Sequence, residues 1–141
     1  MQGAVKKFMG LFKRRPRLFD VEKAIFDALL NELPKEDARI LMTQIGCIAA
    51  IQRLADGVES DFYMSEEFES LAARLHGPDE FLLAKIVLYL PIFSSQLEVD
   101  VRCVSGRIFS FEYKGSVNYY EEALGMDPAP ELIVEVTLLE R

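Results

Sequence analysis

The chain has very few side chains that could carry nucleophilic or metal chemistry. Its 141 residues include one histidine, His76, and two cysteines, Cys47 and Cys103. A catalytic triad would need His76 as its base, but this residue stands in a His-Gly-Pro sequence that is typical of a helix end. The cysteines are far apart in sequence and lie in apolar runs, so we expect two buried free thiols and no zinc site.

The sequence also lacks the patterns of nucleotide and carboxylate chemistry. None of the eight glycines belongs to a G-x-G-x-x-G or Gly-Lys-Ser/Thr pattern, so no phosphate-binding loop is predicted. Each group of acids is explained by a helix start, a preceding proline or a solvent-facing position, although paired carboxylates can serve hydrolysis or metal binding. We therefore expect a protein that is not an enzyme and has no cofactor or metal. The acidic groups are Glu36/Asp37, Glu66/Glu67/Glu69, Asp79/Glu80 and Glu121/Glu122.

Charge is distributed unevenly along the chain. Residues 1–17 contain six bases and no acid, whereas residues 18–141 contain ten bases against 23 acids, a net charge of −13. A strongly acidic body repels nucleic acid and suits a basic protein partner. We expect a basic leader over residues 1–17 and a single domain over residues 18–141.

The leader has two interpretations. Its bases alternate with apolar residues, as in helices that lie on anionic membrane surfaces. Two glycines and Pro16 would end such a helix early, so a solvated tail is the preferred interpretation and membrane-surface contact is the alternative. The chain has no run of about 20 apolar residues, and its N-terminus lacks the apolar region and cleavage site of a signal peptide. We expect a cytoplasmic protein.

Hydrophobic periodicity predicts a helical N-terminal half. Apolar residues recur at helical spacing over residues 18–33 and again over residues 35–56. Ser65 would cap a third helix that ends before Pro78. Residues 58–64 are compatible with a short strand or a loop.

The C-terminal half has the pattern of strands. Residues 81–93 are predicted as a buried strand, although a helix would also suit their Pro-Asp-Glu start. Residues 97–103 alternate strictly between apolar and polar types, and residues 108–114 are predicted to form a hairpin with them. A short helix over residues 116–124 and a last strand over residues 131–139 complete the pattern. The fold class is α+β, with the helical half packed on one face of an antiparallel meander of about four strands.

The hairpin loop decides which side chains face the core. A two-residue loop would place Phe109 opposite Arg102 and would put aromatic side chains on the charged face. A three-residue loop over residues 104–106 places Phe109 opposite Val101 and keeps the core face apolar, so we predict this register. The other face is then polar and acidic, with Glu98, Asp100, Arg102, Ser110, Glu112, Glu135 and Thr137.

Two segments, residues 61–67 and 119–122, combine tyrosines with carboxylates. Tyrosines anchor many interfaces, and a basic partner would need carboxylates. The alternative is that a tyrosine of each segment packs inward and the acids are only solvated. Together with the acids of the sheet face, the candidate partner-binding residues are Asp61, Tyr63, Glu66, Glu67, Glu98, Asp100, Glu112, Tyr119, Tyr120, Glu121 and Glu122.

The sequence GRIFSFEY over residues 106–113, followed by the Tyr-Glu-rich helix and a closing strand, resembles the C-terminal part of bacterial toxin-neutralising immunity proteins. The resemblance covers residues 96–141. Proteins of this class are small, cytoplasmic, usually acidic and without a catalytic site. Their folds differ, so no functional residue is carried over, and the basic leader is not a feature of the class.

These observations predict an acidic protein that masks a basic protein partner and does not bind nucleic acid. An immunity protein that neutralises a toxin is its most concrete form. One alternative is an acidic chaperone for a secreted effector, which would be a stable homodimer. Another is a peripheral membrane adaptor that uses residues 1–17. Both a monomer and a dimer are compatible with the sequence.

Overall fold

The structure is a computed structural model that describes residues 16–66, 68 and 73–141. Most of the predicted leader, residues 1–15, lies outside the described residues. The same holds for residues 67 and 69–72 of the helix predicted after Ser65, although Phe68 is described and buried. The predicted end of this helix is wrong, because residues 73–77 are described and are not helical. Among the described residues, no helix has the length and apolar character needed to cross a bilayer.

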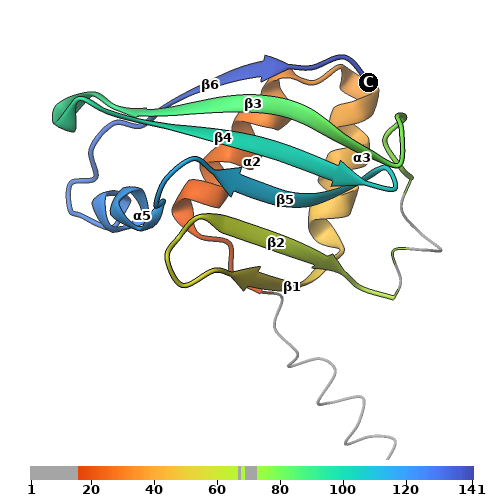
Figure 1. The fold of residues 1–141 in the computed structure, drawn as a ribbon, viewed down its shortest axis with the longest axis horizontal. Coiled ribbons are helices and arrows are strands. Elements are labelled where there is room, and N and C mark those ends of the chain that lie inside the picture. The colour runs from red at the N-terminus through yellow and green to blue at the C-terminus, as the bar shows by residue number, and fades with distance from the viewer. Residues whose placement is uncertain (1–15, 67, 69–72) are drawn as a thin grey trace, which may run out of the picture.

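A six-stranded antiparallel sheet forms the centre of the described fold (Figure 1). Its spatial order is β1-β2-β5-β4-β3-β6, and the α+β class predicted from the sequence is confirmed. The strands are β1 (Ile48–Arg53), β2 (Glu59–Met64), β3 (Glu80–Leu90), β4 (Ser95–Val104), β5 (Arg107–Tyr113) and β6 (Ile133–Leu138).

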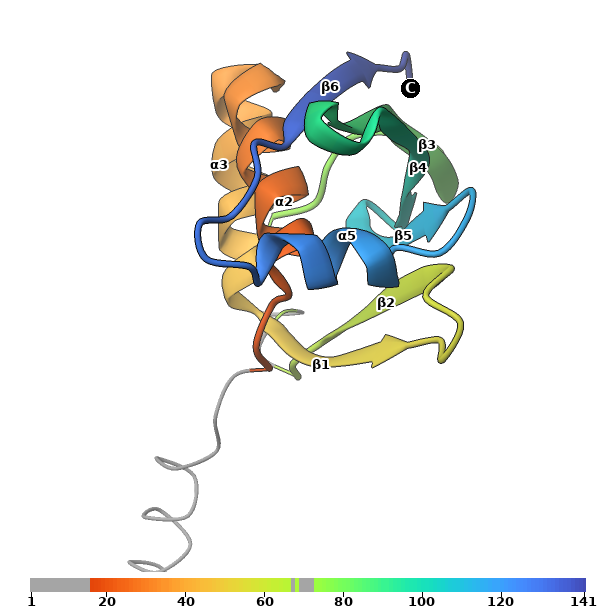
Figure 2. The ribbon, with the colours of Figure 1, turned by 90° about the vertical axis from the view of Figure 1, so that its left-hand side faces the viewer.

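The helices are placed unequally around the sheet. Helices α2 (Asp20–Glu32) and α3 (Lys35–Gly46) cover one face, and the sheet curves around them (Figure 2). Helix α5 (Asn118–Leu124) lies at one end of the sheet, and a short 3-10 helix, η1 (Pro91–Phe93), forms the tip of the β3–β4 hairpin. The opposite, convex face of the sheet has no helix over it in Figure 2, and we call it the outer face.

Aromatic packing joins α2 to the sheet. The Phe26 ring of α2 lies 5.2 Å from that of Phe62 in β2 and 4.8 Å from that of Phe111 in β5, centroid to centroid. The Phe62 and Phe111 rings are 4.9 Å apart and meet edge to face, an arrangement that adds to the area burial of each ring. All three are almost fully buried, so each contributes about 3–5 kcal/mol relative to alanine.

The helix predicted over residues 35–56 is wrong in its second half. Helix α3 ends at Gly46, and the next apolar residues form β1. β1 pairs with β2 through a turn at Gly57, whose φ of +74° suits glycine. An apolar run of this length fits a buried helix or a strand equally well, and pairing with β2 decides between them. The N-terminal half therefore supplies two strands, and the sheet has six strands where about four were predicted.

The predicted hairpin loop is also wrong. Val104 pairs with Arg107, so the loop has two residues, Ser105 and Gly106. Their φ values are +52° and +74°, which matches the type I′ turn that fits the twist of adjacent strands.

The two-residue loop was rejected above because it would put aromatic side chains on the charged face, and a β-bulge in β5 removes this difficulty. Cys103 pairs with Ile108 and Arg102 pairs with Ser110, which leaves Phe109 as the extra residue. Beyond the bulge, the side chains of β5 alternate again, with the apolar ones facing the core. Arg102 consequently faces a serine on the outer face, and the aromatic side chains beyond the bulge remain in the core.

The other C-terminal predictions hold. Residues 80–90 form β3, and only residues 91–93 of the predicted strand are helical instead. The short helix and the last strand are present as α5 and β6. Cys47 and Cys103 are free, and Cys103 is buried as predicted, but the prediction of burial is wrong for Cys47, which is half-buried. Burial raises the pKa of Cys103 to about 12.

Candidate partner-binding face

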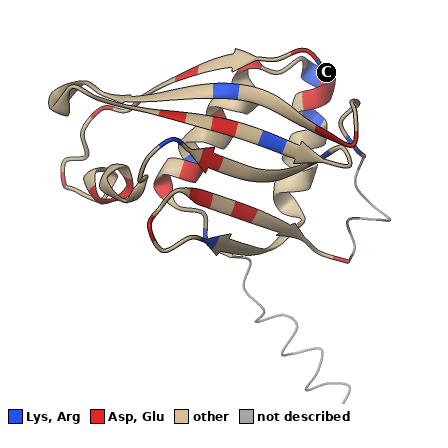
Figure 3. Cartoon of the chain, viewed as in Figure 1, with Lys and Arg blue, Asp and Glu red and all other residues tan. Residues whose placement is uncertain are grey.

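Charged residues lie side by side on neighbouring strands of the sheet, as the coloured bands in Figure 3 show. Strand pairing sets them in rows on the outer face, because residues directly opposite each other in a sheet point to the same face. From β2 toward β6, one row contains Glu59, Glu112, Asp100, Lys85 and Thr137. The adjacent row contains Asp61, Ser110 and Arg102.

The register therefore brings the predicted polar residues of β4, β5 and β6 to one face. Glu98 and Glu135 complete this set, because both pair with Val87 from opposite sides of β3. β2 adds residues that the sequence analysis did not place on this face, since it left residues 58–64 undecided. Among the candidates, Asp61 and Tyr63 join the acids of β4 and β5.

Two of the candidate acids are neutralised by the protein itself. The Glu112 carboxylate accepts hydrogen bonds from Arg102 Nε at 2.7 Å and Nη2 at 3.2 Å. The hydrogen bond and charge of Arg102 lower the pKa of Glu112, against the opposing effect of burial. Arg102 also contacts Glu80 at 3.1 Å.

Asp100 is held in the same way by two lysines. Its Oδ1 lies 3.4 Å from Lys85 Nζ, and its Oδ2 lies 2.9 Å from Lys114 Nζ. Burial acts to raise the pKa of Asp100, but its contacts with Lys114 and then Lys85 lower the pKa overall. Asp100 and Glu112 therefore present little unbalanced charge to a partner.

Glu59 and Asp61 lack such cations. Within the described residues, neither carboxylate forms an ion pair, and Asp61 Oδ1 is buried without a hydrogen-bond partner. The pKa of Glu59 is raised to about 7, first by its hydrogen bond with Asp61, then by burial and by the negative charges of Asp61 and Glu112. The unbalanced negative charge of the central rows is therefore concentrated on β2.

An aromatic pair adjoins these carboxylates. The Tyr63 side chain is 41% exposed, and its hydroxyl donates to Gln52 Oε1 at 3.0 Å. Its ring meets the ring of Phe109, the bulge residue, edge to face at 6.3 Å. We call the surface formed by Glu59, Asp61, Tyr63 and Phe109 the β2 patch. Glu66 follows β2 and is exposed, whereas Glu67 lies outside the described residues.

The structure divides the second candidate segment between structural and exposed positions. Tyr120 is buried, and its hydroxyl lies 2.7 Å from Ser95 Oγ. Glu121 caps helix α2, because its carboxylate accepts from the backbone N–H groups of Asp20 at 3.1 Å and Val21 at 3.0 Å. Tyr119 and Glu122 remain exposed. This segment is therefore not a continuous acidic surface.

Tyr119 belongs to a different surface that the sequence analysis missed. Its ring packs edge to face on Phe93 of η1 at 5.5 Å. Ile92, which precedes Phe93 in the sequence, is 71% exposed. This apolar pair in the middle of a hairpin loop is the sequence signal that could have revealed the surface. We call Ile92, Phe93 and Tyr119 the apolar tip.

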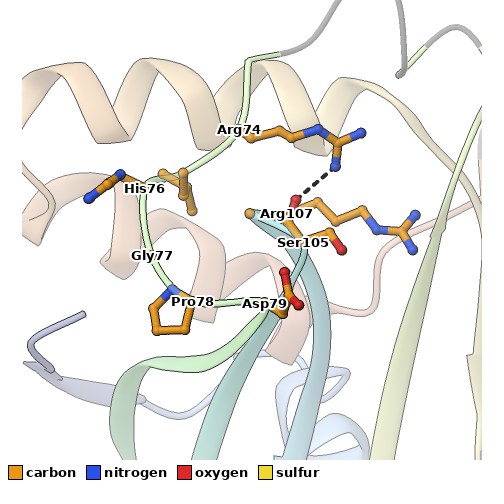
Figure 4. Close-up of a pocket in the computed structure, with 9 residues that line it drawn as sticks. Arg74, His76, Gly77, Pro78, Asp79, Ser105 and Arg107 are labelled. Atoms are coloured by element: carbon orange, nitrogen blue, oxygen red, sulfur yellow. Dashed lines mark hydrogen bonds between the residues drawn. The ribbon is translucent and has the colours of Figure 1, made fainter.

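One pocket among the described residues is lined by polar side chains that do not converge on one point. It has a volume of about 610 Å³ and lies between residues 74–79 and the β4–β5 turn. Arg74 donates to the Ser105 carbonyl at 2.7 Å, and the side chains of His76 and Arg107 extend in opposite directions (Figure 4). No single ligand group would contact all of them.

The β2 patch could have been found from the sequence by its alternation. In residues 59–64, Glu59, Asp61 and Tyr63 alternate with Ser60 and Phe62, a pattern of a strand with one polar face.

Comparison of the chain with protein-family models, with curated proteins and with solved structures gave no match.

Proposed function

We propose that this protein binds and masks a basic protein partner through the β2 patch and does not act as an enzyme. The observation that carries the proposal is the pair Glu59 and Asp61, which lacks a cation among the described residues. A lysine or arginine of a partner would supply the missing charge. Toxin neutralisation, as in the immunity proteins that the C-terminal sequence resembles, is the most concrete form of this function.

The distribution of charge suits rapid association with a basic partner. Residues 18–141 carry a net charge of −13, which attracts a basic protein over long distances at low salt. At contact, the two carboxylates would pair with cations while Tyr63 and Phe109 supply apolar area. Interface energy usually concentrates in a few such aromatic and charged residues.

The free thiols fit a cytoplasmic protein, the location that we propose. Cys47 and Cys103 are both unpaired, as is usual where the compartment is reducing.

The test is an affinity pull-down with the intact chain as bait, washed first at low and then at moderate salt, followed by mass spectrometry. The informative variant is Glu59→Gln with Asp61→Asn. Its matched control is Glu131→Gln with Glu135→Gln, which also replaces two carboxylates by amides, near β6 at the other edge of the sheet. We expect one basic protein to elute with salt, to be lost with the first variant and to be retained with the control.

Two results would refute the proposal. One is equal recovery of the partner by both double variants, which would place binding elsewhere. The other is an association rate for the recovered partner that does not fall as salt rises.

A second candidate function is favoured by the apolar tip. A chaperone for a secreted effector needs exposed apolar surface or a dimer interface, and Ile92, Phe93 and Tyr119 are 71%, 41% and 47% exposed. Light scattering on the intact chain tests this alternative. A stable dimer that Ile92→Ser with Phe93→Ser converts to a monomer would favour the chaperone, and a monomeric wild type would argue against it.

A further inference from the structure

We propose that residues 1–15 of the basic leader bind the β2 patch of their own molecule and compete there with the basic partner. The inference rests on the proposed function for its biological meaning, because both assign the same surface. Its test needs no partner, so the two proposals can fail separately.

Charge complementarity is the first support. Residues 1–15 contain five bases, Lys6, Lys7, Lys13, Arg14 and Arg15, and no acid. The β2 patch offers two carboxylates that have no cation among the described residues. Glu112 and Asp100 on the neighbouring strands compete less well for these bases, because Arg102 and two lysines already neutralise them.

The point where the leader joins the fold is the second support. The Arg17 carbonyl accepts a hydrogen bond from Arg53 Nη2 of β1 at 2.7 Å. Pro16 and Leu18 line a small cavity of about 190 Å³ with Ile48, the first residue of β1. The leader is therefore tethered beside β1, which is an edge strand next to β2.

The distance from this tether to the β2 patch is short. Adjacent strands lie about 4.8 Å apart, so the carboxylates of β2 are one strand away from the edge. Fifteen residues span up to about 50 Å when extended. Because β1 is the outermost strand, the leader can pass around the sheet edge to the outer face without crossing another strand.

The apolar residues of the leader also have a counterpart. Phe8, Leu11 and Phe12 alternate with its bases. The exposed ring of Tyr63 and the half-buried ring of Phe109 provide an aromatic surface beside the carboxylates. A segment that is both basic and aromatic therefore matches a patch that is both acidic and aromatic.

The consequence would be an internal competitor. A tethered segment has an effective concentration in the millimolar range, so even a weak contact would cover the β2 patch for part of the time. A basic partner would have to displace it, and weakly basic proteins would be excluded. This arrangement would sharpen selection of the correct partner.

Zero-length carbodiimide cross-linking of the intact chain at low salt is the direct test. The reagent joins a lysine amine to a carboxylate only when the two are in contact. We expect peptides that link Lys6, Lys7 or Lys13 to Glu59 or Asp61. In a mixture of light and isotopically heavy protein, the links should join peptides of the same isotope, and they should be lost at 0.5 M salt, where the Debye length is about 4 Å.

A fluorescent reporter provides a second measurement. The chain contains no tryptophan, so Phe12→Trp introduces a single one into the leader. We expect acrylamide to quench this tryptophan weakly at low salt. Quenching should rise to the level of a free peptide in the Glu59→Gln, Asp61→Asn background and should stay low in the Glu131→Gln, Glu135→Gln control.

Several outcomes would overturn the inference. Links to Glu122 or Glu131 in place of the β2 patch would assign the leader to another surface, and links only between light and heavy chains would assign it to a second copy. Absence of links at low salt, with binding of the intact chain to anionic vesicles, would favour the membrane contact. Partner binding that persists after any of these results would leave the proposed function standing.

Discussion

Glu22 and Glu59 lie on opposite sides of the sheet and differ in their charge partners. The carboxylate of Glu22 is paired with an arginine, whereas that of Glu59 has no cation among the described residues. Glu22 of α2 is 1% exposed, and Arg53 of β1 contacts it through Nε at 2.9 Å and Nη2 at 2.7 Å. It also accepts the Phe19 N–H at 2.7 Å. Glu59 is half-buried on the outer face and has no cation within the described residues.

The paired carboxylate of Glu22 stabilises the fold, whereas the unpaired carboxylate of Glu59 does not. A buried charge is stable only when it is paired and its oxygens are hydrogen-bonded, and Glu22 meets both conditions. Near the surface, an unpaired carboxylate costs less and can hold a proton instead, as the raised pKa of Glu59 indicates. Such a group is available for a cation from outside.

The largest expected effect follows from breaking the buried ion pair between Arg53 and Glu22. Arg53→Ala leaves the Glu22 carboxylate buried without its partner and removes the contact of the guanidinium with the Phe19 ring, 3.6 Å from its centroid. We expect the free energy of unfolding to fall by about 3–5 kcal/mol, measured by urea denaturation at pH 7.

A matched control exists on the protein surface. Arg39 pairs with Glu36 at 3.3 Å, but both side chains are about 70% exposed, so Arg39→Ala should change the unfolding free energy by less than about 0.5 kcal/mol. Equal effects of the two arginine variants would contradict the role given to burial.

An intermediate effect is expected where the outer face is compensated. Arg102→Gln removes the hydrogen bonds to Glu112 and the contact with Glu80, and should cost about 1.5 kcal/mol at pH 7. Because Arg102 lowers the pKa of Glu112 below its unfolded value of 4.5, this stabilisation is present above pH 4.5 and is lost as the pH falls through the folded pKa.

Urea denaturation of the wild type and Arg102→Gln at pH 7 and at pH 3 checks that dependence. The difference between them should shrink at the lower pH. A constant difference would show that Arg102 acts through packing of its stem.

The smallest change in the free energy of unfolding is expected for Glu59, which has no cation partner among the described residues. Its substitution should stabilise the protein, whereas the arginine substitutions destabilise it. The folded-state pKa of Glu59, about 7, lies above its ordinary value of 4.5. Its contribution to stability is therefore complete below pH 4.5 and is lost as the pH rises through 7. After allowance for solvent screening, we expect Glu59→Gln to stabilise the protein by about 1 kcal/mol at pH 8 relative to pH 5. Thermal unfolding at both pH values measures it, and a pH-independent effect would argue against the raised pKa.

The sequence could predict elements whose pattern is local. The alternation in residues 97–103 predicted β4, and a short helix was predicted over residues 116–124; both are present. The helix predicted to continue past Gly46 failed, because its apolar residues fit either structure and only pairing with β2 selects the strand. The bulge at Phe109 also depends on the partner strand.

The candidate site shows the same division. Period-2 alternation predicted that Asp100 and Glu112 share a polar face, and strand pairing places them opposite each other. Their neutralisation could not be predicted, because the cations for Asp100 come from β3 and from the residue after β5. Likewise, Glu121 caps a helix that begins about one hundred residues earlier in the chain.

The two thiols give the chain a built-in labelling site. Cys103 is buried in β4 with a strongly raised pKa, so little of it is the thiolate that alkylating reagents attack. Cys47 is half-buried between α3 and β1 and is the thiol that maleimide reagents can reach in the folded protein. A spin label or dye attached to the natural sequence would therefore report from the edge of the sheet beside the leader's tether, without engineering of the cysteines.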